Sequence, residues 1–331
     1  MTRNLQPDMK LADLYSLVNS RFASLQIIED PRGLFEPLDY SIKNGGKRIR
    51  PVLTLLSAHL FGGDLAKAFN PAIGLELFHN FTLIHDDIMD NAPLRRGQPS
   101  VFTKWDSNTA ILSGDALFAL AGKYMTQVDD LHLRRIMDLY HKTVLEVCKG
   151  QQYDMEFEKR TSVTLGEYLE MIRLKTAVLP AACLQVGAIV ANASEKNLKL
   201  VYDFGELIGL AFQIKDDWLD LFGNEEKFGK KTGGDIIANK KTWLYLKALE
   251  VADKASFNAL ANSYSSKAFN EREKIASVKN IFKNLSIDKL ALLEIDKFYE
   301  RAIEKLNQIE APEDKKSLLY ELAEGLVERE T

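Results

Sequence analysis

Hydrophobic residues recur roughly every three to four positions along almost the whole chain, and this helical period constrains the fold more than any other feature. We find no convincing run of the alternating pattern that a half-buried strand produces. Glycine and proline fall mostly between the periodic segments, where they end helices. Predicted helices include 8–29, 65–91, 164–191 and 195–222, and several more follow from 240 to 331. With 46% hydrophobic residues among 331, the chain can bury a large core, so we predict an all-α protein.

Composition excludes several broad classes of protein. A formal charge of −4 without a basic tail gives no reason to expect a nucleic-acid partner. Cys148 and Cys183 are the only cysteines, and their apolar, helix-like surroundings predict buried free thiols in a reducing compartment. The first residues lack an apolar signal segment. The apolar stretch 176–193 contains Pro180 and Gln185, so we expect a buried helix, no membrane span and a cytoplasmic protein.

An acidic cluster stands at the end of a long apolar run, within residues 76–97. Asp86, Asp87 and Asp90 are followed by the pair Arg95-Arg96. At about 100° per residue, Asp86 and Asp90 lie one turn apart on one helix face. Clustered carboxylate oxygens suit Mg²⁺, which takes one or two protein carboxylates and completes its shell with water and phosphates. Arginines just beyond the cluster would bind those phosphates through paired hydrogen bonds.

A second acidic cluster repeats this pattern far downstream. Asp216, Asp217 and Asp220 follow the apolar helical stretch 204–212. A single acidic cluster is usually a solvated helix face. Two DDxxD clusters on two helices predict that the clusters face each other across a cavity and hold a metal-bridged diphosphate.

Several cations could serve the same chemistry. Lys47 and Arg50 follow the pair Gly45-Gly46 and open a helix, where anions bind well, although a solvated loop would look the same. Lys175 stands in an apolar helix and must either reach water or find an anion. The glycine-rich loop 222–235 carries Lys230 and Lys231, and both a mobile lid and a solvated linker fit it.

Taken in order, five motifs resemble the trans-isoprenyl diphosphate synthases, the polyprenyl synthetase family, and are most like its short-chain geranylgeranyl and farnesyl diphosphate synthases. The motifs are Gly45-Gly-Lys-Arg-Ile-Arg-Pro51, His79…His85-Asp-Asp-Ile-Met-Asp90, Leu94-Arg-Arg-Gly97, Lys175-Thr176 and Gln213…Asp216-Asp-Trp-Leu-Asp220. The resemblance covers nearly the whole chain and is weakest over its last ninety residues. It implies one isoprenoid synthase domain over 1–331, a single large bundle of long helices around a central cavity (the isoprenoid synthase type I fold), usually as a homodimer.

The resemblance also implies an activity and assigns roles to residues. The family enzymes are prenyltransferases that join isopentenyl diphosphate head-to-tail to an allylic diphosphate. They use Mg²⁺, three ions together with diphosphate, with Mn²⁺ as an alternative. The implied metal ligands are Asp86, Asp90 and Asp216, with Asp87, Asp217 and Asp220 as further ligands or neighbouring partners. The implied contacts to the allylic substrate are Arg95, Lys175, Thr176, Gln213, Lys230 and Lys240, and those to isopentenyl diphosphate are Lys47, Arg50, His79 and Arg96.

The family chemistry explains this choice of residues. The difficult step breaks the allylic C1–O bond and leaves a carbocation and pyrophosphate, so no protein nucleophile is needed. Mg²⁺ acts as a Lewis acid on the departing diphosphate, and lysine and arginine add positive charge. An apolar cavity keeps water from the cation. Pyrophosphate itself is the expected base for the final proton.

Product length is predicted from the helix before Asp86. In the family, bulk on this helix forms the floor of the cavity. Phe81, an aromatic residue five positions before the motif, and the small Thr82 resemble archaeal-type geranylgeranyl synthases, with Phe78 one turn further back. We therefore expect a C20 product, with a C15 farnesyl or a longer polyprenyl product as alternatives.

Three other readings are weaker. A class I terpene synthase has a different second motif and lacks the pocket around Lys47 and Arg50. A di-iron protein needs Glu-x-x-His on two helices, and only Glu76-Leu-Phe-His79 matches. A non-catalytic regulatory subunit typically loses an Asp motif, whereas both are intact in this chain.

Overall fold

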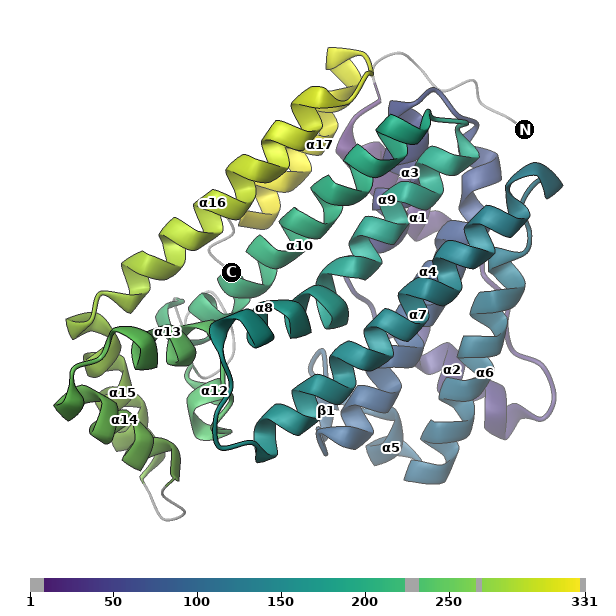
Figure 1. The fold of residues 1–331 in the computed structure, drawn as a ribbon. Coiled ribbons are helices and arrows are strands. Elements are labelled where there is room, and N and C mark those ends of the chain that lie inside the picture. The colour runs from purple at the N-terminus through teal and green to yellow at the C-terminus, as the bar shows by residue number, and fades with distance from the viewer. Residues whose placement is uncertain (1–8, 224–231, 266–269, 328–331) are drawn as a thin grey trace. The chain divides into compact units, whose positions relative to one another are not determined.

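The computed structural model describes residues 9–223, 232–265 and 270–327, and nearly all of this part of the chain is helical (Figure 1). The helices up to residue 159 are α1 (Leu11–Ala23), α2 (Arg32–Lys43), α3 (Ile49–Leu60), α4 (Leu65–Met89), α5 (Val101–Lys104), α6 (Ser107–Met125) and α7 (Asp130–Lys159). The later ones are α8 (Leu165–Ile172), η1 (Arg173–Ala177), α9 (Val178–Val190), α10 (Glu195–Phe222), α12 (Gly234–Ile237), α13 (Trp243–Val251), α14 (Lys254–Ser265), α15 (Glu271–Asn284), α16 (Ile287–Gln308) and α17 (Glu313–Val327). The all-α prediction is confirmed.

The chain divides into two compact units. The first comprises Met1–His141, Ala182–Val201 and Glu310–Leu318, and the second comprises Lys142–Ala181, Tyr202–Ile309 and Leu319–Thr331. Each unit has its own share of the buried leucine, isoleucine, valine and aromatic side chains. The expectation of one domain over 1–331 stays a prediction.

In the first unit, α4 packs along α6 and against α3. Asp64 caps the start of α4 by accepting a hydrogen bond from the Ala66 amide at 2.9 Å. Gly74 makes the close packing of α6 feasible, because a Cβ atom there would lie only 2.9 Å from the Ala121 carbonyl oxygen. The last turns of α4, which bear the first acidic cluster, are therefore held on a buried helix.

In the second unit, α8, the π-helical turn η1 and the start of α9 follow one another without a break. α13 packs against α8 and α16, and α15 packs against α12, α14 and α16. α8, α12, α13 and α15 each donate a hydrogen bond to the end of α10, which bears the second acidic cluster.

Some predicted details were wrong. The first helix ends at Ala23 instead of residue 29, because the Ser24 hydroxyl and amide bond back to the carbonyls of Arg21 and Ser20 and close the last turn. The predicted helix 164–191 is interrupted by the π-helical turn η1. Cys148 is exposed and not buried, because it falls on the outer face of α7; Cys183 is buried, and both are free thiols. A two-residue hairpin, β1 (Leu94–Arg95) with β2 (Gln98–Pro99), was not expected.

The run Leu165–Val190 is long and apolar enough to cross a membrane by length and composition alone. However, 72% of its apolar window is buried inside the structure. This burial is what a core helix shows, as predicted for residues 176–193.

Candidate active site

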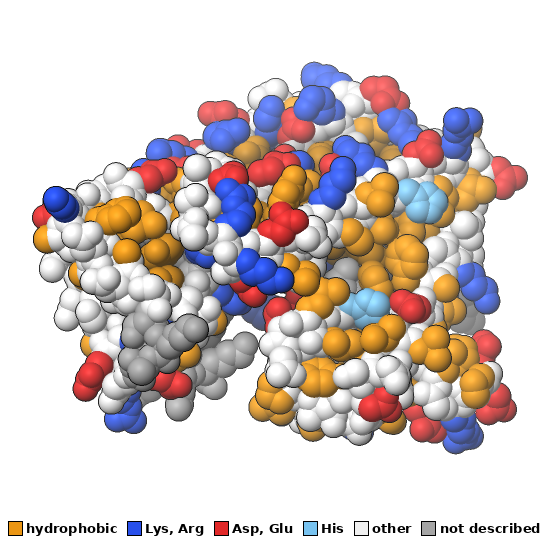
Figure 2. Space-filling model, turned by 60° about the horizontal axis from the view of Figure 1, so that its bottom comes forward, with side chains coloured by type: hydrophobic (Ala, Val, Ile, Leu, Met, Phe, Trp, Pro, Cys, Tyr) orange, Lys and Arg blue, Asp and Glu red, His pale blue; other side chains and the backbone are white. Residues whose placement is uncertain are grey.

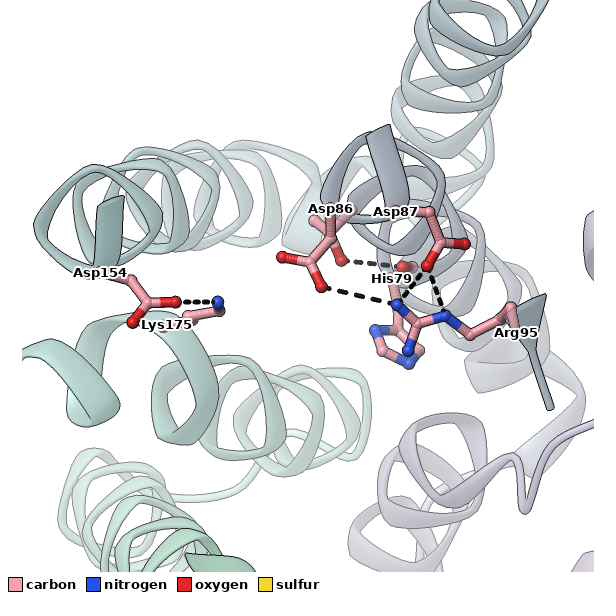
Figure 3. Close-up of polar contacts among 7 residues, drawn as sticks. His79, Asp86, Asp87, Arg95, Asp154 and Lys175 are labelled. Atoms are coloured by element: carbon pink, nitrogen blue, oxygen red, sulfur yellow. Dashed lines mark hydrogen bonds and ion pairs between the residues drawn. The ribbon is translucent and has the colours of Figure 1, made fainter. Parts of the chain in front are cut away.

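The first acidic cluster lies at the end of α4, where Asp86 and Asp87 occupy the last turns and Asp90 is the C-cap residue. Asp87 is buried and accepts two hydrogen bonds from Arg95, one from Nε at 2.8 Å and one from a terminal nitrogen. The same guanidinium lies 3.6 Å from Asp86 Oδ2, so that Arg95 reaches both carboxylates (Figure 3). Burial raises the pKa of Asp87, and Arg95 opposes that shift. Asp86 and Asp90 are the more accessible carboxylates of the cluster.

The short hairpin after α4 determines where Arg95 points. Its two turn residues, Arg96 and Gly97, have φ angles of 53° and 75°, the left-handed values of a type I′ hairpin turn. The register pairs Arg95 with Gln98, and the Asn44 side chain donates to the Arg95 carbonyl oxygen at 3.2 Å. The hairpin therefore fixes the backbone of Arg95 beside the end of α4.

A second feature of this unit is a group of arginines around one buried carboxylate, Glu76, which is only 3% exposed. The charges of Arg50, Arg48 and Arg96 all lower the pKa of Glu76, although burial raises it more. Arg96 donates to the Gly45 carbonyl oxygen, and a Cβ atom on Gly46 would lie 2.7 Å from the Arg96 guanidinium. The φ of 125° at Gly46 also favours glycine at this position.

His79 belongs to the same group. Burial first, and then the charges of Arg50 and Arg96, hold the pKa of His79 well below its usual value near 6.5. The imidazole is therefore neutral at neutral pH and can donate a hydrogen bond without adding charge. Of the four residues predicted to bind isopentenyl diphosphate, these interactions bring Arg50, His79 and Arg96 together, while Lys47 lies exposed in the adjoining loop.

The second unit contains an open cavity of about 750 Å³, its mouth included. Six of the predicted residues line it, namely Lys175, Thr176, Gln213, Asp216, Asp217 and Lys240. Asp154, Tyr168 and Asp235 line it as well. Lys230 lies outside the described residues.

The π-helical turn η1 presents Lys175 and Thr176 to this cavity. A Cβ atom on Gly150 of α7 would lie 2.3 Å from the Lys175 amide nitrogen, so glycine is what lets α7 approach the turn. Lys175 Nζ then reaches Asp154 Oδ2 at 2.5 Å (Figure 3). Thr176 donates to Gln213 Oε1 at 3.2 Å. π-Helical turns often occur at functional sites.

Asp217 is buried, and its carboxylate is occupied by protein donors. The Tyr168 hydroxyl donates to Asp217 Oδ2 at 2.5 Å and the Trp243 amide donates to the same oxygen at 2.9 Å. Burial and then the charge of Asp235 raise the pKa of Asp217 to about 8, and the two donors act in the opposite direction. Asp216, one residue earlier, is exposed.

Asp220 connects the end of α10 to a residue that the sequence did not single out, Asp235. The Asp235 amide donates to Asp220 Oδ2 at 3.1 Å, and the Gly233 amide donates to the Asp220 carbonyl oxygen at 2.6 Å. Burial and then the charge of Asp220 raise the pKa of Asp235 to about 6. Lys240 lies 3.6 Å from Asp235. Three carboxylates, Asp216, Asp220 and Asp235, are thus close enough to repel one another.

The donor chemistry of both clusters fits Mg²⁺. Every candidate ligand is a carboxylate oxygen, the type that hard cations prefer. Burial and mutual repulsion raise the pKa of Asp220 and Asp235, and a divalent cation would reverse that effect. Within the described ranges, no three His, Cys, Asp or Glu side chains form a ready-made cage for an ion.

An aromatic cluster packs beside the first acidic cluster. The Phe81 ring lies 5.3 Å from Phe118 and 5.8 Å from Phe78, measured between ring centres, and Phe78 contacts Tyr140 at 5.8 Å. Phe78 and Tyr140 are buried. Thr82, by contrast, turns its hydroxyl back to the His79 carbonyl oxygen at 2.8 Å. Of the three residues predicted to control product length, the two phenylalanines therefore belong to one ring cluster.

Sequence reasoning missed Glu76, Asp154, Tyr168 and Asp235 as parts of the site. Only weak signals pointed to them. Glu76 is a lone carboxylate in an apolar run, and Asp235 directly follows a glycine pair. Asp154 and Tyr168 stand among ordinary amphipathic residues and carry no local signal.

Comparison with known proteins finds relatives that match most of the chain. The family model described as polyprenyl synthetase matches residues 31–282. Geranylgeranyl diphosphate synthase of Methanosarcina mazei is 37% identical over 95% of both chains, and that of Sulfolobus acidocaldarius is 38% identical over 89% of this chain and 91% of the other. A crystal structure of a geranylgeranyl pyrophosphate synthase superposes with a TM-score of 0.93 at 40% identity, covering 98% of this chain and all of that one. The predicted isoprenoid synthase fold is therefore confirmed, and the chain belongs to the polyprenyl synthetase family of prenyltransferases.

Proposed function

We propose that this enzyme condenses isopentenyl diphosphate with allylic diphosphates and releases geranylgeranyl diphosphate, a C20 product. The observation that carries the proposal is the pair of acidic clusters, each accompanied by cations: Arg95 at the first, and Lys175 and Lys240 at the second. This combination suits a diphosphate leaving group and leaves no role for a protein nucleophile. The relatives named geranylgeranyl diphosphate synthase support the C20 product.

Asp86, Asp90 and Asp216 would hold Mg²⁺, which supplies Lewis-acid stabilisation to the departing diphosphate. Arg95 keeps Asp87 in place and is itself available to phosphate oxygens. The allylic diphosphate would bind at the cavity of the second unit. Four residues assigned to this substrate line that cavity, namely Lys175, Thr176, Gln213 and Lys240. Lys230 is assigned the same role from the family motif alone. Ionisation then needs no proton transfer from the protein.

Arg50, Arg96, His79 and Lys47 are assigned to the diphosphate of isopentenyl diphosphate. The single carboxylate of Glu76 balances only part of the positive charge of Arg50 and Arg96. A dianionic group bound beside the two arginines would balance the rest. Neutral His79 supplies a hydrogen bond. Holding this diphosphate would aim the acceptor alkene at the allylic carbon.

Arg50→Ala is expected to raise the KM for isopentenyl diphosphate tenfold or more, because a charge-assisted hydrogen bond contributes about 1.5–3 kcal/mol. The KM for the allylic substrate should change less than about twofold, since that substrate uses the other cations. Steady-state kinetics with each substrate varied in turn checks this, with Arg134→Ala as the control at an exposed arginine of the same unit. Equal effects on the two KM values would argue against separate anion sites.

Phe81→Ala is expected to lengthen the product by at least one five-carbon unit. Removing the ring takes away the packing partner of Phe118 and opens space beside the end of α4. Chromatography and mass spectrometry of the dephosphorylated products measure the length, and Phe257→Ala, at an exposed ring of α14, is the control. An unchanged product would place the floor of the cavity elsewhere.

We propose that the enzyme is a homodimer formed through α6. The outer face of this helix exposes Ile111 by 44%, Leu112 by 59% and Phe118 by 37%. Figure 2 shows hydrophobic side chains on the surface, among them several on the right of the view. Large apolar side chains exposed close together on one helix suit a protein interface. Light scattering should give twice the monomer mass of 37.4 kDa for the wild type, and a monomer for Leu112→Lys.

A cytoplasmic location is proposed on the two free thiols, which fit a reducing compartment.

The experiment that tests the function itself is product analysis. Purified protein is incubated with Mg²⁺, isopentenyl diphosphate and each allylic primer in turn, and the alcohols are sized after dephosphorylation. A dominant C20 alcohol supports the proposal. A dominant C15 alcohol, or one longer than C20, would support the condensation reaction but show that the product length is wrong. If no primer is condensed, the proposed function is wrong.

A further inference from the structure

The helix α15 lies in the C-terminal part of the chain, where the sequence offers no motif. It begins at Glu271, the side chain of Asn270 caps its first turn, and it packs on α12, the helix that carries Asp235. Two of its lysines, Lys274 and Lys279, donate hydrogen bonds to two segments that follow the second acidic cluster in the chain.

Lys279 acts on the first of these segments, the end of α10. Its Nζ donates to the Leu221 carbonyl oxygen at 2.8 Å, one residue after Asp220. The same nitrogen lies 5.5 Å from the centre of the Phe222 ring. Because this carbonyl belongs to the last turn of α10, a cation beside it also suits the negative end of the helix dipole.

Lys274 acts on the second segment, which ends at Lys240. It is only 6% exposed, and its Nζ donates to Asn239 Oδ1 at 2.5 Å, one residue before Lys240. It also lies 5.4 Å from the centre of the Tyr264 ring. Burying an ammonium group costs free energy, so a buried lysine with an amide and an aromatic face as neighbours is held in a defined place.

Between the two lysines, Ile275 packs directly on Gly233. A Cβ atom on Gly233 would lie 2.8 Å from the Ile275 side chain, and the φ of 85° at Gly233 also favours glycine. The Gly233 amide in turn bonds to Asp220, and the next residue but one, Asp235, bonds to the Asp220 carboxylate. The Lys240 amide donates to the Asp235 carbonyl oxygen at 2.9 Å. One face of α15 thus contacts every backbone segment that carries Asp220, Asp235 and Lys240.

We propose that α15 is a positioning element for the second acidic cluster, in which Lys279 fixes the backbone after Asp220 and Lys274 fixes the side chain before Lys240. Neither lysine touches substrate. Together they would keep Asp220, Asp235 and Lys240 in fixed positions, and these groups would then act on a metal-bound diphosphate. This inference rests on the proposed metal-assisted function.

Lys274→Met and Lys279→Met keep the aliphatic stem and remove the donor, and Lys283→Met, at an exposed site of the same helix, is the matched control. Binding of inorganic pyrophosphate in saturating Mg²⁺ is measured by isothermal titration calorimetry, and the Mg²⁺ concentration for half-maximal turnover is measured by product release. Each of the first two variants should bind pyrophosphate about tenfold more weakly and should need about tenfold more Mg²⁺ for half-maximal turnover. Losses of this size are usual for residues that orient metal ligands. The control should leave both values unchanged. The KM for isopentenyl diphosphate should stay within twofold.

Asn239→Ala gives an independent check that leaves the helix itself intact. If Lys274 acts through Asn239, the Asn239→Ala/Lys274→Met double variant should bind pyrophosphate no more weakly than Lys274→Met alone. Unchanged Mg²⁺ and pyrophosphate binding in both lysine variants, or a fall in melting temperature alone, would overturn the inference. The calorimetric readout separates this from a failure of the proposed reaction, because pyrophosphate binding requires no turnover.

Discussion

Asp216→Ala and Asp86→Ala are each expected to lower kcat about a thousandfold while the fold survives. A lost metal ligand removes several kcal/mol of charge stabilisation from the departing diphosphate, and each 1.4 kcal/mol or so is tenfold in rate. Asp216 is exposed and Asp86 is half-buried, so neither substitution opens a large cavity in the core. Turnover at saturating substrates and Mg²⁺ measures the effect, and circular dichroism melting confirms folding.

The matched control for this prediction is Asp203→Ala on α10. Asp203 lies on the same helix as Asp216 and pairs with Lys305 at 3.5 Å, a contact at the surface of the second unit. A partly exposed ion pair contributes at most about 1 kcal/mol to stability, and it has no role in the chemistry. Near-wild-type turnover of Asp216→Ala would end the metal assignment, and a similar loss in the control would show that α10 is simply sensitive to charge.

The second large effect is expected on stability. Asp217→Ala should lower the free energy of unfolding by about 2–5 kcal/mol, because it leaves two buried donors, the Tyr168 hydroxyl and the Trp243 amide, without their acceptor. Chemical denaturation in the presence of EDTA measures this loss without any contribution from metal. Asp203→Ala serves again as the surface control.

The family resemblance leaves two roles open for Asp217, that of a metal ligand and that of a partner beside the ligands. Asp217→Asn distinguishes between them. Asparagine retains an acceptor for Tyr168 and Trp243 but is a poor substitute for a charged metal ligand. If Asp217 mainly joins α8 and α13 to α10, Asp217→Asn should keep kcat within about tenfold of the wild type. A loss as large as that of Asp216→Ala would instead make Asp217 a metal ligand.

The helices were predictable because their signals are local. The apolar period, the caps and the helix-breaking residues all lie within a few positions of one another, and the predicted helix 195–222 coincides with α10 (Glu195–Phe222). The clustering of Asp86 with Asp90 and of Asp216 with Asp220 follows from the same helical geometry. The ordered motifs were enough to identify the family.

The tertiary structure decided how these residues are used, because the deciding contacts join distant positions. The π-helical turn that presents Lys175 depends on the approach of Gly150 in another helix, which no local period can reveal. Asp235 meets Asp220 across fifteen residues, and Glu76 meets Arg50 from a separate helix. Likewise, Asp87 and Asp217 look like their neighbours in sequence, yet Arg95, Tyr168 and Trp243 occupy their carboxylates. Sequence alone determined which groups are available and on which helix face they lie, whereas packing determined their burial, their partners and therefore their charge.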